Sequence, residues 1–295
     1  MRNNAKQILA QANTALKEWW EKDPFRESAV IAYYAIFALP GLLVVIVTVA
    51  GYWFGPEAVN GQIAGQITST MGADMAKQIQ EIIVKGTESR NSVWATIIGL
   101  ITILVGATGV FVEFQKSINT IWHVKADQTK SGIVSLLKTR LFSFGLIIAV
   151  TFILIVSLVV STVLSAFGTW ISNHFSESLF VVLQVINFVV SLSILAVLFA
   201  LMFKVFPDAK IKWRHVWMGS FVTALLFEIG KSALGLYFGT VEPGSGYGAA
   251  GSIILILLWV SYSSMIVFYG AEFTHAHAVW NDGKIPPDKN AVVQK

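Results

Sequence analysis

The residues of this sequence that are best suited to chemistry are charged side chains inside apolar segments. Glu228 and Lys231 stand three positions apart near the middle of one such segment, so on a helix their side chains are within reach of each other. An ionisable group in apolar surroundings is costly unless it is paired or hydrated, and it therefore marks a candidate functional site. The pair could line a cavity that binds a polar or anionic group, or it could be a self-neutralising structural pair.

Three further polar residues extend this candidate substrate-binding set. Gln184 and Asn187 share one helical face with Ser191 in another apolar segment, where amide groups must find hydrogen-bond partners. They could join two helices or line a polar cavity. Glu113 ends a stripe of small residues, and it is either the mouth of the same cavity or an ordinary interfacial charge.

Proline and glycine mark five positions of predicted gating or close packing. Pro40 lies near the middle of the first apolar segment and is predicted to kink it. Gly106 and Gly109 belong to the small-residue stripe, which favours close approach of two helices. Gly248 and Gly251 precede the last apolar segment, where glycine permits either a tight turn or an outer gate.

No cofactor, metal or nucleic acid is expected to bind. The chain has no cysteine, which excludes disulfides and thiolate metal sites. His275 and His277 are two positions apart, so a helix directs them to different sides and they make a poor metal pair. The loops carry no phosphate-binding motif, and no basic and aromatic surface suits RNA. We therefore expect a protein that is not an enzyme.

The elements that must position these residues are membrane-spanning helices. Hydrophobic residues make up 55% of the chain and charged residues 13%, whereas soluble domains carry roughly 25% charged residues. A bilayer core requires roughly 20 apolar residues per helix. The sequence predicts an all-α integral membrane protein with six spans: 29–54, 93–111, 141–167, 179–203, 216–238 and 249–269.

The segments outside the spans have distinct predicted roles around a transmembrane domain of residues 29–272. Residues 1–28 contain an amphipathic helix expected at the inner membrane surface. The long outer loop between the first two spans is predicted to be partly helical, with an apolar stripe that lies on the membrane or caps the bundle. The tail, 273–295, is short and polar beyond Trp280, and we expect it to be flexible.

The distribution of Lys and Arg predicts the orientation of the spans. The first outer loop carries only Lys77, Lys85 and Arg90, and the loops 168–178 and 239–248 carry none. The alternate segments hold the other basic residues, except Lys231 within a span. Because cytoplasmic segments are enriched in Lys and Arg, both termini are predicted to be cytoplasmic.

Several strings along the chain resemble family signatures. They are residues 28–34 (SAVIAYY) with 37–40 (FALP), 114–122 (FQKSINTIW), 207–208 (PD), and 247–252, 258–264 and 270–273 (YGAAGS, LWVSYSS, GAEF). Together they resemble the YihY / virulence factor BrkB family, which has also carried the label ribonuclease BN. Ala38 departs from that pattern, which has serine there. The resemblance implies a multi-pass protein of the bacterial inner membrane with a transporter-like or flippase-like role.

Three functions remain open from the sequence. The first is a transporter that moves or flips a lipid, an envelope precursor or a small polar solute, with membrane lipids as partners and oligomers possible. The second is a non-transporting scaffold or envelope-assembly and virulence factor. The third is a membrane-bound hydrolase or ribonuclease, for which the residues offer no acidic cluster that would hold catalytic magnesium.

Overall fold

The computed structural model describes residues 2–71, 76–77, 79–81, 83–84, 93–127, 177–241, 243–289 and 291–294. These residues are mostly helical. The helices are α1 (Arg2–Glu21), α2 (Pro24–Phe54), α3 (Pro56–Met71), α5 (Val93–Ile121), α7 (Glu177–Val205), α8 (Trp213–Val241) and α9 (Gly251–Asp282). A 3₁₀ helix, Ser245–Ala250, precedes α9, and the strands β1 (Val124–Ala126) and β2 (Ala291–Val293) pair antiparallel. The predicted span 141–167 lies outside the described residues.

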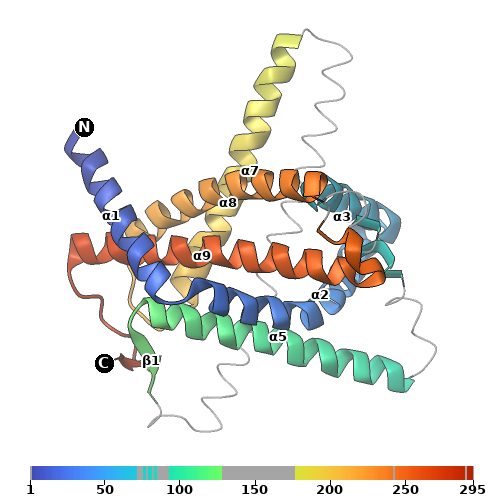
Figure 1. Cartoon of the computed structure of the whole chain (residues 1–295), viewed down its shortest axis with the longest axis horizontal. Helices are drawn as coiled ribbons and strands as arrows, with labels where there is room; N and C mark the ends of the chain where they lie inside the picture. Colours follow the sequence, from blue (N-terminus) through green and yellow to red (C-terminus); the bar gives the residue numbers. More distant parts are fainter. Residues whose placement is uncertain are drawn as a thin grey trace.

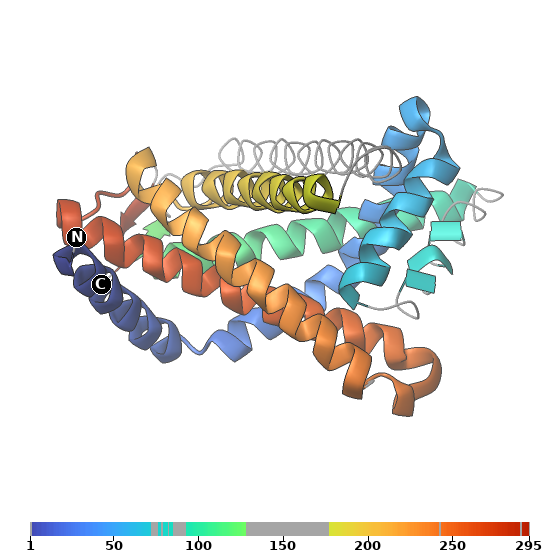
Figure 2. The ribbon, with the colours of Figure 1, turned by 90° about the horizontal axis from the view of Figure 1, so that it is seen from above.

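Helix α9 is the centre of the bundle and contacts α1, α2, α5, α7 and α8. Both chain termini lie at one end of the molecule, called the terminal end below, and α3 lies at the opposite end (Figure 1). Helix α8 crosses α9 at an angle when the molecule is seen from above (Figure 2). The first two long helices are separated at Asp23, whose φ is 52°, and Pro24 then occupies the first turn of α2, a position where proline needs no hydrogen-bond donor.

Three helices of the described part are long and apolar enough to cross a membrane. These segments are Phe188–Val205 of α7, Trp213–Val241 of α8 and Ile253–Asp282 of α9. Large apolar side chains of α7 and α8 point outward, among them Val185, Phe188, Val189, Phe221, Ile229 and Leu236. Side chains of this kind suit lipid rather than water. The helical membrane class is thus confirmed, whereas the number of six spans stays a prediction.

The small-residue stripe of α5 lies against α2. A Cβ atom on Gly106 would stand 2.9 Å from the backbone nitrogen of Ala38, and one on Gly109 would overlap the ring of Tyr34. The absence of side chains at these two positions therefore lets the two helices approach closely. Helix α2 continues through Pro40, whose side chain lies outside the described part of the structure.

Helices α8 and α9 meet through a reciprocal contact that the sequence did not reveal. Gly219 of α8 lies against Thr274 of α9, and Gly270 of α9 lies against Thr223 of α8. Each threonine Oγ1 donates a 2.7 Å hydrogen bond to the carbonyl of the glycine one turn earlier in its own helix. Both threonines are fully buried. The hydroxyls are satisfied within their own helices, so the two backbones can approach at the glycines.

The opposite end is closed by the segment that follows α2. Ile63 and Ile67 of α3 pack with Ile79 and Ile83 into one apolar cluster that includes Val47 and Val59. Ile256 of α9 belongs to the same cluster. These four isoleucines of the outer segment, where an apolar stripe was predicted, therefore pack on the ends of α2 and α9.

At the terminal end, the prediction of a flexible tail is wrong. Helix α9 continues to Asp282, beyond the predicted span end at residue 269. The chain then returns beside the segments that follow α5 and α7: β2 pairs with β1, and the amides of Lys210 and Asp288 donate to the carbonyls of Pro286 and Asp208. These backbone hydrogen bonds join residues far apart in sequence, so hydropathy and polarity could not indicate them.

Two of the family-like strings meet in this region. Asn119 Nδ2 donates to Asp208 Oδ2 at 2.8 Å, and the Asp208 amide donates back to Asn119 Oδ1 at 2.8 Å. Burial raises the pKa of Asp208, and the Asn119 hydrogen bond opposes that shift. These strings therefore hold the end of α5 to the segment after α7.

Candidate functional site

The charged pair predicted in the fifth apolar segment is present in α8. Lys231 Nζ lies 2.5 Å from Glu228 Oε1, and the two side chains are 25% and 18% exposed. The second carboxylate oxygen, Glu228 Oε2, is buried and has no hydrogen-bond partner among the described residues. A buried acceptor of this kind is costly. The pair therefore has capacity left to bind another polar group.

The face of α8 that bears the pair is fully buried in its first part and partly exposed at the pair. Val216, Ser220 and Ala224 stand four positions apart on this face, and each is fully buried. Glu228 continues the same row. Ser220 Oγ is a second buried atom with no hydrogen-bond partner in the described part. This face of α8 is thus buried up to Ala224 and partly exposed at the pair, which lies farther toward the α3 end.

The other predicted binding residues have different surroundings. Glu113 Oε2 contacts Lys116 Nζ at 3.4 Å, one turn farther along α5, which is the arrangement of an ordinary interfacial charge. Gln184 and Asn187 lie in α7, but their side chains are outside the described part of the structure. Their predicted role stays a prediction.

The glycines before the last span form a tight turn. Gly248 lies in the 3₁₀ helix, and Gly251 begins α9. A Cβ atom on Gly251 would stand 2.5 Å from the carbonyl oxygen of Gly244. The two backbones touch at this point, which corresponds to the tight-turn interpretation of the glycine-rich loop.

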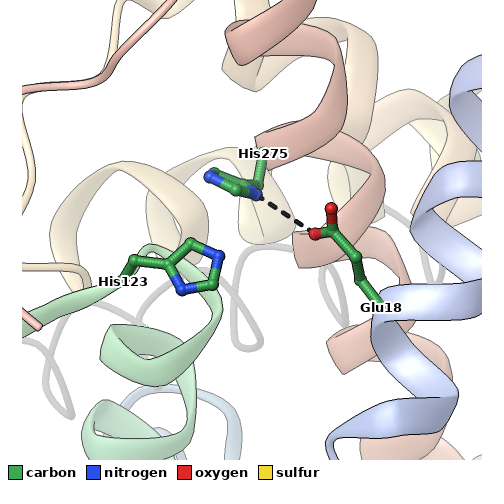
Figure 3. A group of neighbouring side chains, drawn as sticks. All are labelled: Glu18, His123 and His275. Carbon is green, nitrogen blue, oxygen red and sulfur yellow. Dashed lines mark ion pairs between the residues drawn. The ribbon is translucent and has the colours of Figure 1, made fainter. Parts of the chain in front are cut away.

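A second group of charged side chains gathers at the terminal end. Glu272 of α9 is 1% exposed, and its Oε1 lies 2.6 Å from Lys22 Nζ, just after α1. Glu18 Oε2 lies 4.0 Å from the same ammonium group and 3.6 Å from His275 Nδ1. His123, in the turn after α5, completes the group (Figure 3). Three segments that are distant in sequence therefore converge on one polar centre.

The protonation of this group follows from its contacts. Interaction with the His275 imidazole lowers the pKa of Glu18 to about 2, with the charge of Lys22 adding to the effect and burial opposing it. Burial lowers the pKa of His123, and the nearby charges of Lys22 and His275 act in the same direction. At neutral pH Glu18 is therefore ionised and His123 is neutral.

The sequence missed this group because its members lie on separate segments. The prediction that His275 and His277 point to different sides agrees with the structure: His275 packs beside His123 and Trp122, whereas His277 packs beside His215 and lies 3.0 Å from Gln11 Oε1. A signal was present in Glu272, a carboxylate next to an apolar span. Its partner Lys22 lies 250 positions earlier in the chain.

The sequence of this chain matches a family of bacterial membrane proteins along most of its length. Residues 15–294 match the family model described as virulence factor BrkB. A UPF0761 membrane protein of Pseudoalteromonas atlantica is 25% identical over 256 residues, covering 85% of this chain and 80% of the relative. Another from Haemophilus influenzae is 24% identical over 250 residues, covering 83% of this chain and 86% of the relative.

This chain spans a smaller share of other relatives. A UPF0761 membrane protein of Tolumonas auensis is 28% identical over 195 residues, which cover 65% of this chain and 60% of the relative. No solved structure matches the sequence. The relatives are named as membrane proteins, and their names specify no substrate.

Proposed function

Because this chain belongs to the virulence factor BrkB family of membrane proteins, we propose that it is a transporter-like protein of the bacterial inner membrane. It moves or flips a lipid with an anionic headgroup through its helix bundle, and both of its termini face the cytoplasm. It has no enzymatic activity of its own. The observation that carries this proposal is the Glu228–Lys231 pair within α8.

The chemistry of the pair suits an anionic headgroup. A lysine ammonium has three N–H donors, and one of them is used toward Glu228 Oε1. The remaining donors can bind a phosphate oxygen of the headgroup. Charged residues in a membrane helix are costly and typically mark a substrate pathway.

The partial exposure of the pair suits contact with a transported headgroup rather than a purely structural role. A structural pair would be closed over by packing, whereas both of these side chains keep part of their surface exposed. The row of buried residues before Glu228 closes the path toward the terminal end. The headgroup would thus enter from the α3 side and reach the pair before the fully buried part of this helix face.

The scaffold alternative receives less support. One of the features that favoured it is the long amphipathic outer segment, which could offer a surface to an envelope partner. Ile63, Ile67, Ile79 and Ile83 instead pack against each other and the ends of α2 and α9. Side chains already packed within the chain offer little surface to a partner.

The experiment is a leaflet-exchange assay in proteoliposomes. Vesicles containing the purified protein and a fluorescent NBD-labelled phosphatidylglycerol are treated with dithionite, which bleaches only the outer leaflet. Wild type is expected to expose inner-leaflet probe to bleaching, and Lys231→Met is expected to slow this exchange by at least tenfold, since the headgroup loses its cationic partner. The control is Lys284→Met, which removes an exposed lysine of the tail.

Two results would contradict the proposal. One is a well-incorporated Lys231→Met protein that exchanges the probe at the wild-type rate. The other is wild-type vesicles that exchange the probe no faster than protein-free vesicles, for both phosphatidylglycerol and a zwitterionic phosphatidylcholine probe.

A further inference from the structure

The polar centre at the terminal end has the composition of a metal site. We propose that Glu18, His123 and His275 bind one divalent transition metal ion of the zinc class. The inference goes beyond the transport proposal, because these residues lie at the terminal end, away from the Glu228–Lys231 pair, and neither claim depends on the other. Figure 3 displays the three side chains pointing toward a shared centre from three different segments.

The distances are close to those of a bound ion. One possible ligand atom from each residue lies within 4.8 Å of the other two, and Glu18 Oε2 is 3.6 Å from His275 Nδ1. In a tetrahedral zinc site with bonds near 2.1 Å, ligand atoms are about 3.4 Å apart. One pair is thus already near the required spacing, and the third ligand atom lies within 4.8 Å of both.

Two of the proposed ligand atoms are buried and make no hydrogen bond in the described part of the chain. Glu18 Oε2 and His275 Nδ1 are buried and accept or donate no hydrogen bond among the described residues. Their 3.6 Å separation exceeds that of a hydrogen bond. The His275 side chain is only 10% exposed, so leaving its ring nitrogen unpaired is costly. A metal ion between the two atoms would satisfy both.

The backbone at the third ligand is held in an unusual conformation. His123 has φ of 52°, a left-handed conformation that is uncommon outside glycine and often occurs at functional positions. Its amide donates to the Thr120 carbonyl, and its own carbonyl accepts from the Gln294 amide. The returning tail therefore fixes the histidine at the edge of the centre, where its side chain is exposed and an ion can enter.

The ligand types select the ion. The side chains of Glu18 and Glu272 both face the ammonium group of Lys22 at this centre. Two imidazole nitrogens and one carboxylate oxygen suit zinc and its neighbours, whereas magnesium and calcium prefer all-oxygen sites. Three protein ligands leave a fourth position for water. The bound ion would connect α1, the turn after α5, and α9.

The test uses full-length protein purified in detergent through a tag that contains no histidine. Isothermal titration with zinc chloride is expected to give one saturable site per chain, and zinc is expected to raise the melting temperature while magnesium chloride does not. His123→Gln, His275→Gln and Glu18→Gln should each weaken zinc affinity by roughly 100-fold, since even the loss of a supporting residue costs 10–100-fold. His277→Gln is the matched control, because it removes a histidine of the same helix that also contacts α1.

Because the His123 side chain is exposed, His123→Gln is expected to fold even if the His275 variant does not. The proposal is overturned if wild type shows no saturable zinc binding. It is also overturned if folded His123→Gln binds zinc as tightly as wild type, or if His277→Gln loses as much affinity as the three ligand variants.

Discussion

Gly219→Ala is expected to lower the stability of the folded protein by roughly 3 kcal/mol, near the upper end of the usual cost of overpacking. The added Cβ would occupy the space of the Thr274 side chain, and it would stand only 3.1 Å from the Thr274 Cα atom. Because the backbone of α9 stands behind that side chain, rotation of Thr274 cannot relieve the overlap. Helices α8 and α9 must therefore move apart.

The measurement is thermal unfolding in detergent, followed by the loss of the monodisperse peak in size-exclusion chromatography. The expected change is a decrease of about 10 °C in the midpoint. Gly239→Ala is the matched control in the same helix, because nothing lies within 4 Å of its added Cβ, and it should stabilise slightly through helix propensity. An unchanged midpoint for Gly219→Ala would contradict the close contact. Partial recovery in the double variant Gly219→Ala with Thr274→Ala would locate the clash.

Lys22→Met is expected to cost about 3 kcal/mol, since it leaves the buried carboxylate of Glu272 without its cation. Glu272 is 1% exposed, and the 2.6 Å contact with Lys22 is its ion pair among the described residues. The loss should loosen α1, which rests on α9 through Ala15 and Phe273. Limited proteolysis should then cleave α1 faster in the variant, and the melting midpoint should fall.

Two further variants separate this effect from a general loss of charge. Lys17→Met removes an exposed lysine of α1 and should leave both measurements unchanged. The double variant Lys22→Met with Glu272→Gln replaces the ion pair by a neutral pair and should recover most of the stability. If the double variant is as unstable as Lys22→Met alone, the ion pair is not what anchors α1.

Features that depend on neighbours in sequence could be predicted. The spacing of Glu228 and Lys231 predicted an intrahelical contact, and the structure has it at 2.5 Å. The ends of α7 lie within two residues of the predicted span 179–203. The stripe that contains Gly106 and Gly109 likewise predicted the kind of surface that packs against another helix.

Features that depend on the path of the whole chain could not be predicted from the sequence. Glu18, His123 and His275 come from three segments, and nothing in their local sequences indicates that they meet. The tail beyond Trp280 has the composition of a flexible terminus, yet its backbone pairs with β1 and with the segment after α7. A backbone hydrogen bond leaves no mark on side-chain composition, so only the fold reveals it.

The proposed role of Glu228 and Lys231 is to bind the headgroup of a transported lipid. Native mass spectrometry of the protein purified in mild detergent tests it most directly, by identifying the lipids that remain bound. Wild type and Lys284→Met are expected to retain one anionic headgroup class, and Lys231→Met is expected to lose it while remaining folded. Equal retention of that class by Lys231→Met, or retention of bulk phospholipid alone by wild type, would contradict the claim.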